Sequence, residues 1–200
     1  MLKTVKMVFF SLCLMLSLSL LASKVEAAPK DQPVVKIETN MGNIVVELDE
    51  SKAPLTTQNF LKYVESGHYE GTIFHRVIRD FMIQGGGLTS DMKDKPTRAP
   101  IKNEANNGLH NRKYTIAMAR TSDPHSATAQ FFINTANNSN LDYRGSNEQD
   151  WGYAVFGRVI SGKEVVDKIE RVATTSRGMH KDVPISPIVI RKISIMPRKR

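Results

Sequence analysis

An arginine in the segment FHRVIRDFMIQGGG, residues Phe74–Gly87, is the first candidate for chemistry. Apolar residues alternate there as in a half-buried β-strand, but Arg76 and Gln84 stand where a packed face would take hydrocarbon. A half-buried guanidinium needs partners, and its planar fork of donors suits a carbonyl or a carboxylate. Arg76 is therefore either a donor to a ligand or the structural partner of an acid such as Glu104. Strand alternation predicts that Phe74 and Arg76 share one face.

A second segment, SATAQFFIN at Ser126–Asn134, combines the same residue types. Gln130 precedes Phe131 and Phe132, and alternation places Gln130 and Phe132 on a common face. Two strands that each offer polar donors beside aromatic rings favour a groove that recognises an extended backbone and seats one apolar ring. The alternative is an ordinary core in which both phenylalanines are buried.

Other chemistries find little support in the sequence. The five histidines lack metal-ligand spacing and the only cysteine is Cys13, so neither a metal site nor thiol chemistry is expected. The glycines Gly85–Gly87 lack the lysine and hydroxyl residue of a phosphate loop. Asp123, His125 and Ser126 are too close along the chain for a nucleophile triad, which assembles from distant segments, and we predict a polar loop there.

The first 27 residues have the features of an export signal. Lys3 and Lys6 precede an uncharged apolar run, Met7–Ala22, and Val25–Ala27 fits the small-x-small pattern of a cleavage site. An uncleaved membrane anchor is the alternative, but the run is short for a spanning helix. We therefore predict a signal peptide over residues 1–27 and an exported mature chain without cysteine.

The composition of the whole chain, 40% hydrophobic and 24% charged, suits one globular domain, which we assign to residues 28–200. Removal of the signal peptide lowers the formal net charge from +8 to +6, and much of that charge lies in the last ten residues, which close with Arg198–Arg200. A basic tail can hold nucleic acid or anionic lipid. Because no aromatic residues interleave with these charges, we expect a solvated terminus and no specific nucleic-acid binding.

Apolar alternation and β-branched clusters predict about eight short strands around two helices. The first helix begins near Pro54 and stops at Gly67, and the second runs from Lys163 to about Val172. This density of strands implies a sandwich or a barrel whose ends the helices could cover. The predicted strands are Val34–Glu38, Asn43–Leu48, Thr72–Ile78, Phe81–Gln84, Thr115–Ala119, Gln130–Asn134, Ala154–Ile160 and Ile188–Met196.

The chain resembles the cyclophilin family of peptidyl-prolyl isomerases, and in particular its bacterial periplasmic branch. Matching motifs stand in consistent order and spacing through nearly all of the chain after the signal peptide. The resemblance implies a mainly β fold, a closed eight-stranded antiparallel β-barrel capped by two α-helices, with side chains filling the barrel and the active groove on its outer face. The motifs are FHRVI and FMIQGG within Phe74–Gly86, NE at Asn103–Glu104, TIAMA at Thr115–Ala119, SATAQFFI at Ser126–Ile133, NLD at Asn140–Asp142 and VFGRV at Val155–Val159.

The resemblance also implies roles for ten residues. Arg76 matches the family's catalytic arginine, and the main chain at Ala119 and Arg120 matches the segment that receives the substrate backbone. Gln84 and Gln130 match polar groove residues. The remaining positions surround the proline ring: Phe81, Met82, Phe132 and Leu141 match the family, and Tyr153 stands where many members have a histidine but periplasmic relatives resemble this chain.

The activity implied is that of a peptidyl-prolyl cis-trans isomerase, or rotamase. It would act on proline-containing segments of unfolded or exported proteins, assist their folding and work as a monomer in the periplasm, or alternatively after full secretion. No metal or cofactor is implied, because rotation about a peptide bond neither makes nor breaks a bond. A chaperone or adaptor that only retains proline-containing peptides is the alternative function.

The chain also departs from the family pattern at Asn140 and at Arg79 and Asp80. Asn140 stands where many eukaryotic members have a tryptophan that helps to bind cyclosporin, so we expect weak binding of that drug, and Trp151 lies in a separate loop. Arg79 and Asp80 replace a Pro-Gly turn between two strands, and the sequence assigns no function to that change.

Overall fold

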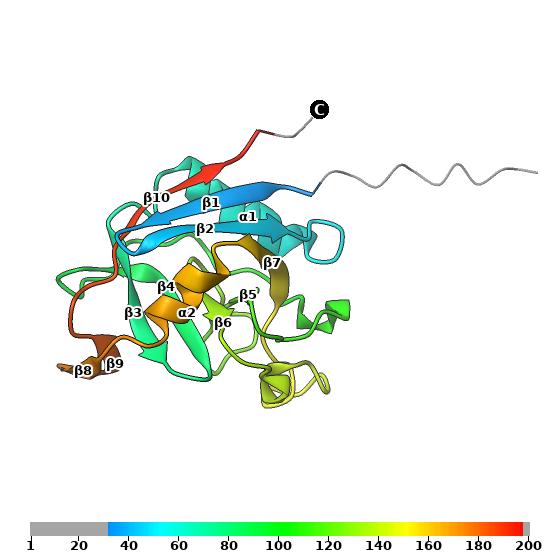
Figure 1. The fold of residues 1–200 in the computed structure, drawn as a ribbon. Helices are drawn as coiled ribbons and strands as arrows, with labels where there is room; N and C mark the ends of the chain where they lie inside the picture. Colours follow the sequence, from blue (N-terminus) through cyan, green and yellow to red (C-terminus); the bar gives the residue numbers. More distant parts are fainter. Residues whose placement is uncertain (1–31, 198–200) are drawn as a thin grey trace, which may run out of the picture.

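A computed structural model describes residues 32–197, which form a β-barrel with two helices (Figure 1). The predicted signal peptide, residues 1–27, and the basic end, Arg198–Arg200, lie outside the described residues. The strands are β1 (Val34–Thr39), β2 (Gly42–Leu48), β3 (Thr72–Ile78), β4 (Met82–Thr89), β5 (Thr115–Met118), β6 (Phe131–Asn134), β7 (Val155–Ser161), β8 (Thr174–Arg177), β9 (His180–Pro184) and β10 (Ile190–Ile195), and the helices are α1 (Pro54–Glu65) and α2 (Lys163–Ile169), with short 3-10 turns at Ala105–Asn107 and Ser139–Leu141.

Eight of the strands form one antiparallel sheet in the order β10–β1–β2–β7–β5–β6–β4–β3. The two end strands meet, because Ile73 bridges to Val189 and the amide of Phe74 donates to the carbonyl of Ile188 at 2.9 Å. This contact closes the sheet into a barrel and leaves little free edge. The predicted fold class is confirmed, and each of the eight predicted strands has its counterpart.

Apolar side chains fill the barrel. The ring of Phe60 on α1 lies 5.6 Å from Phe131 and 5.3 Å from Phe156, centroid to centroid, and all three are fully buried. Such packing leaves no space inside for a ligand, so any binding site of this barrel has to lie on its outer surface. Branched residues from six strands complete the interior, among them Ile37, Val46, Val77, Ile83, Ile116 and Ile133.

Helix α1 begins and ends where the sequence predicts. Pro54 occupies its first turn, and the carboxylate of Glu104 accepts hydrogen bonds from the amides of Leu55 at 3.1 Å and Thr56 at 2.8 Å. These are amides that a helix start leaves without intrahelical partners. Glu104 therefore caps α1, and the predicted alternative in which it pairs with Arg76 is wrong. Gly67, at φ +66°, follows the end of the helix.

Helix α2 is three residues shorter than predicted. Val165, Val166 and Ile169 pack on the barrel, but the amide of Val172 bonds to Ile169 three residues back, so the chain leaves the helix in a turn. The apolar period alone could not show this change. Within residues 32–197, no helix is long and apolar enough to cross a membrane.

The sequence analysis missed the hairpin of β8 and β9. Its two-residue turn joins Arg177 to His180, with Gly178 at φ +60°, and Val183 anchors its base at 1% exposure. The hairpin lies outside the main sheet, and β9 lies against β3 (Figure 1). Two threonines and a central glycine were available as strand and turn signals, but all four β8 side chains are polar and exposed, so no alternation marks the strand.

A bulge in β3 changes which residues share a face. The register against β4 shifts between Phe74 and Arg76, so Phe74 points into the core beside Phe131 whereas Arg76 and Ile78 face outward. The predicted common face of Phe74 and Arg76 is therefore wrong. An extra residue in one strand reverses the alternation that follows it, and a sequence pattern does not reveal where such a residue falls.

The turn after β3 keeps a simple form. The amide of Phe81 donates to the carbonyl of Ile78, and Asp80 at the second central position has φ +56°. Positive φ at that position alone is the pattern of a type II turn, which Pro-Gly also suits. Asp80 is further held because its amide donates to the carboxylate of Glu170, at 3.3 Å, just beyond α2.

Candidate active site

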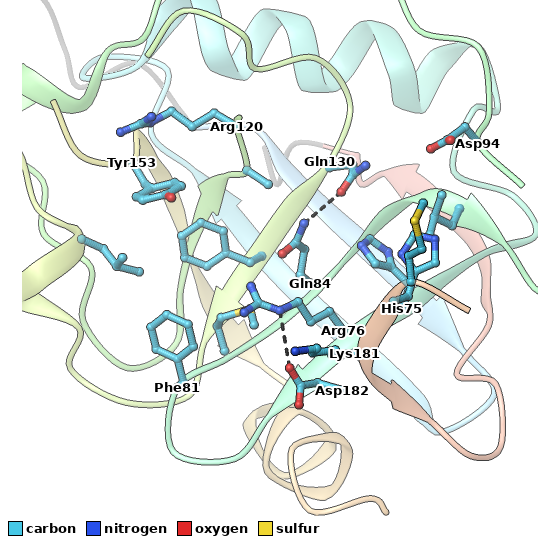
Figure 2. A pocket seen from close by; sticks show the side chains of 17 residues that line it. His75, Arg76, Phe81, Gln84, Asp94, Arg120, Gln130, Tyr153, Lys181 and Asp182 are labelled. Atoms are coloured by element: carbon cyan, nitrogen blue, oxygen red, sulfur yellow. Dashed lines mark hydrogen bonds and ion pairs between the residues drawn. The ribbon is translucent and has the colours of Figure 1, made fainter. Parts of the chain in front are cut away.

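A groove of about 570 Å³ runs over the outer face of β3, β4, β5 and β6 (Figure 2). All ten residues proposed from the sequence line it, although they come from segments 77 positions apart, from Arg76 to Tyr153. The roles of the ten residues stay predictions, but the fold brings them together. Seven more residues complete the lining: His75, Leu88, Asp94, Met179, His180, Lys181 and Asp182.

Arg76 stands in the middle of this groove. Its side chain is 43% exposed, and its Nε lies 3.8 Å from Oδ2 of Asp182, whose side chain is 42% exposed. An ion pair that is this long and this open contributes little to stability. The guanidinium therefore remains available to a ligand while one carboxylate stands on its far side (Figure 2).

On one side of Arg76 lies an apolar pocket that is separate from the barrel core. Met82, Ala117, Phe132 and Val155 are at most 4% exposed and form their own cluster. The rings of Phe132 and Tyr153 meet edge to face, 5.6 Å apart. Partly exposed apolar residues rim the cluster, and they include Ile78, Phe81, Leu109, Ala119, Leu141 and Tyr153. Phe131 and Phe132 are both buried, as the alternative expects, but they lie in different clusters, Phe131 in the barrel core and Phe132 in this one.

A pair of amide side chains forms the polar wall of the groove. Nε2 of Gln84 donates to Oε1 of Gln130 at 2.9 Å. Gln130 packs so closely over β4 that a Cβ on Gly87 would lie 2.5 Å from its Cγ. Gly86, at φ +85°, adopts a backbone conformation that disfavours other residues. The three glycines thus lie within strand β4, at positions where other atoms approach the backbone closely.

Ala119 and Arg120 form the neighbouring edge of the groove. The amide of Ala119 donates to the carbonyl of Gln130 at 3.0 Å, which fixes this segment to β6. Arg120 stacks over Tyr153 with its Cζ 4.8 Å from the ring centroid, and its Nε donates to the carbonyl of Gly152 at 2.9 Å. The Arg120 side chain therefore holds the loop before Tyr153, which is consistent with a main-chain role toward a ligand.

On the other side of Arg76, the groove continues to a wall that the sequence analysis missed. Hairpin β8–β9 supplies Met179, His180, Lys181 and Asp182 to the lining. The segment after β4, with Asp94, lies across from them (Figure 2). Only the contact of β9 with β3 makes these residues neighbours of Arg76, so no motif in their own segment signals the site.

His75 lies at the base of this second half, and it is only 6% exposed. Burial, helped by the nearby His180, lowers its pKa from the ordinary value of 6.5 to about 4. At neutral pH the imidazole is uncharged. Arg76 thus has no second cation directly beside it on β3.

Two further sequence expectations concern this region. Trp151 donates to the carbonyl of Asn103 and packs edge to face on His125 and Tyr143, so it belongs to a neighbouring loop and not to the groove lining. In residues 32–197, no three His, Cys, Asp or Glu side chains converge as a metal site requires.

Comparisons with a family model and with known proteins all match peptidyl-prolyl cis-trans isomerases. The family model described as cyclophilin type peptidyl-prolyl cis-trans isomerase/CLD matches residues 34–195. Two relatives each align with 162 residues, or 81% of this chain. A peptidyl-prolyl cis-trans isomerase of Streptomyces antibioticus is 59% identical, and the match covers 98% of that protein. Peptidyl-prolyl cis-trans isomerase B of Escherichia coli (strain K12) is 54% identical, and the match covers 99% of that protein.

Solved structures agree with the sequence relatives. A crystal structure of a cyclophilin type peptidyl-prolyl cis-trans isomerase from Cryptosporidium parvum has a TM-score of 0.69 at 28% identity, and the match covers 84% of this chain and 99% of the other. The structure of that protein in the presence of the dipeptide Ala-Pro has a TM-score of 0.68 at 28% identity, covering 82% and 99%.

Proposed function

This chain belongs to the cyclophilin-type family and is a peptidyl-prolyl cis-trans isomerase, and we propose that Arg76 and the apolar pocket beside it perform the rotation. The observation that carries the proposal is the position of one half-exposed guanidinium at the rim of a self-contained apolar cluster, within a single groove. The roles proposed for the other groove residues depend on what rotation about an X–Pro bond requires.

The barrier to this rotation is the resonance of the amide. It amounts to about 18–20 kcal/mol, and unaided X–Pro bonds interconvert in tens to hundreds of seconds. Because no bond is made or broken, the catalyst needs no nucleophile and no acid–base pair. It has only to bind the twisted amide more tightly than either planar form.

Arg76 supplies that difference. Twisting the amide localises the lone pair on the proline nitrogen, and a guanidinium beside this nitrogen can then donate a hydrogen bond to it. The bond is strongest in the transition state, where the lone pair is least delocalised. Asp182 behind Nε favours an orientation in which the remaining donors face the groove. A lysine ammonium would not reproduce the planar fork.

The apolar pocket holds the ring while the chain turns. Met82 and Phe132 form its base, and Phe81, Leu141 and Tyr153 rim it. Gln84 and Gln130, with the main chain of Ala119 and Arg120, hold the chain next to the proline. One side of the rotating bond is thus fixed by apolar contact and the other by hydrogen bonds.

The substrates that we propose are proline-containing segments of unfolded, exported proteins. The relative from Cryptosporidium parvum was crystallised in the presence of Ala-Pro, which supports an X–Pro unit as the recognised element. The sequence pattern of residues 1–27 supports export, and we propose the periplasm as the location, with full secretion as the alternative. We further propose a monomer with weak affinity for cyclosporin.

Substitution of Arg76 tests the mechanism. We expect Arg76→Ala to lower kcat/KM for a short X–Pro peptide on the order of a hundredfold, because a donor made for the transition state is lost. Arg76→Lys should recover only part of this loss. Arg158→Ala is the matched control, since Arg158 is an exposed barrel arginine paired with Glu47 at 2.8 Å outside the groove. An Arg76→Ala protein with undiminished kcat/KM would exclude the mechanism.

The same assay separates catalysis from retention. An adaptor would bind a proline-containing peptide but leave its cis-to-trans rate unchanged at stoichiometric protein. Following the conversion and the binding of one peptide in parallel distinguishes the two functions. Cell fractionation tests the proposed location.

A further inference from the structure

An exposed methionine occupies the rim of the groove beyond Arg76. Met179, at the tip of hairpin β8–β9, lines the groove and is 97% exposed, more than any other large apolar side chain in residues 32–197. In a two-residue hairpin turn that starts with glycine, the second position is ordinarily Asn, Asp or Ser. Nothing in the fold of the hairpin therefore requires an apolar residue at 179.

The hairpin that carries Met179 is fixed at three points. Its base is anchored by Val183, and near its tip Nη1 of Arg177 donates to the carbonyl of Ser90 at 3.3 Å. Between these points, Asp182 reaches the guanidinium of Arg76 from a backbone with φ +60°. Aspartate is among the residues that tolerate this backbone conformation. The hairpin thus presents Met179 in a defined place at the groove.

The surroundings of Met179 indicate what it would bind. Two uncharged groups, the buried Leu88 and the neutral imidazole of His75, line the outer half of the groove together with His180 and the charged side chains of Lys181, Asp94 and Asp182. The charged side chains of Lys181 and Asp94 stand on opposite walls and have opposite sign (Figure 2). Arg76 and Asp182 likewise form a pair of opposite sign, so neither sign of ligand charge is favoured, whereas the exposed side chain of Met179 offers contact to an apolar side chain.

We propose that Met179 and hairpin β8–β9 form a second binding site for the substrate chain, which takes an apolar side chain flanking the X–Pro pair. The proposal rests on the function proposed above, because the groove is continuous and a chain with its proline in the pocket extends from there. A thioether on an unbranched side chain adapts to apolar groups of different shape. The site would therefore favour unfolded polypeptides, with their exposed apolar residues, over very short peptides.

Two kinds of substrate and four proteins test this inference. The substrates are an X–Pro tetrapeptide and a set of longer peptides in which one leucine is moved through the positions on either side of the proline. The proteins are the wild type, Met179→Ser, Met179→Leu and Ile185→Ser. Ile185 is a matched control because it is 61% exposed, lies at the foot of the same hairpin and does not line the groove.

The measured quantity is the ratio of kcat/KM for each long peptide to that for the tetrapeptide. At the best leucine position, we expect Met179→Ser to lower this ratio about fivefold, the effect of losing part of a buried apolar contact. Met179→Leu should stay within about twofold of the wild-type ratio, since it conserves apolar contact. Ile185→Ser should keep the wild-type ratio. A ratio that Met179→Ser leaves unchanged for every peptide would overturn the proposal.

NMR of methyl-labelled methionine distinguishes failure of this inference from failure of the proposed function. Peptide binding in the groove should shift the methyl resonance of Met82, in the apolar pocket, with both kinds of substrate. The resonance of Met179 should shift more with the leucine peptide than with the tetrapeptide. If only Met82 responds, the second site does not exist. If Met82 fails to respond, the proposed use of the apolar pocket is wrong.

Discussion

Two neighbouring residues of one strand show how the barrel core and the groove differ. Phe131 is fully buried and touches the rings of Phe60, Tyr69 and Phe74. Phe132 is 4% exposed, but it packs in a small cluster on the opposite face of β6, where its ring meets that of Tyr153. Similar burial therefore occurs in the closed core and beside the groove that we propose as the binding surface.

The difference lies in what completes each cluster. Core residues are surrounded by other side chains on all sides, so their packing is complete in the protein itself. The groove cluster borders the groove that Arg76, Gln84 and Gln130 also line. Under the proposed function, a bound ligand completes its contacts. Substitutions in the two regions should accordingly change different measured quantities.

The largest effect is expected from the phenylalanine pair. Phe131→Ala should lower the free energy of unfolding by about 3–5 kcal/mol, because it leaves a closed cavity. Phe132→Ala should lower the free energy of unfolding clearly less, since the space that it leaves opens into the groove. It should lower kcat/KM about tenfold or more, because the proline ring of the substrate loses apolar contact. Urea denaturation and the peptide assay measure the two quantities. Equal losses of stability would contradict the separation of core and groove.

His75 offers a way to sharpen the comparison, since it lines the groove but is buried like a core residue. Its folded-state pKa of about 4 lies below the ordinary 6.5, so below pH 6.5 the unfolded chain binds a proton that the folded chain does not. The resulting loss of stability should develop as pH falls from 6.5 to 4 and reach on the order of 3 kcal/mol.

The measurement for His75 is the free energy of unfolding across this pH range in the wild type and in His75→Gln. Other titrating groups affect both proteins alike, so the variant should lose less stability on acidification. Parallel curves would show that the imidazole takes up its proton in the folded state as readily as in the unfolded chain.

Gly87 tests whether the polar wall of the groove can be disturbed without disturbing the core. A Cβ at 2.5 Å from Cγ of Gln130 must displace that side chain and its bond to Gln84. We expect Gly87→Ala to lower kcat/KM about tenfold. Gly145→Ala is the control, because its added Cβ would find no atom nearer than 3.6 Å. The explanation would be wrong if both variants kept wild-type activity.

The smallest effect is expected at the junction of the groove and the hairpin. Asp182→Asn retains a residue type that tolerates positive φ and removes only the charge beside Arg76. Because the ion pair is long and exposed, kcat/KM should fall by about two- to threefold. Loss of more than tenfold in the peptide assay would instead place Asp182 within the catalytic machinery.

Local patterns in the sequence were enough for the parts of this protein that depend on neighbours along the chain. Alternation located eight strands, Pro54 and Gly67 bounded the first helix, and the motifs around Arg76 and Gln130 led to the groove. The predictions that were wrong depend on contacts between segments that are distant along the chain or paired in the sheet. Glu104 caps α1 from about 50 residues away, and the phase of β3 depends on a bulge against β4.

Periodicity in the sequence located the strands and indicated a sandwich or a barrel, since it is written in consecutive residues. The resemblance of its motifs to the cyclophilin family implied the closed barrel and the ten residues that line the groove. Only the tertiary structure decided the second half of the groove. Hairpin β8–β9 reaches Arg76 because β9 lies against β3, about a hundred residues earlier in the chain. Its own residues are mostly polar and follow no period, because contact with a distant strand, and not local pattern, determines where they lie.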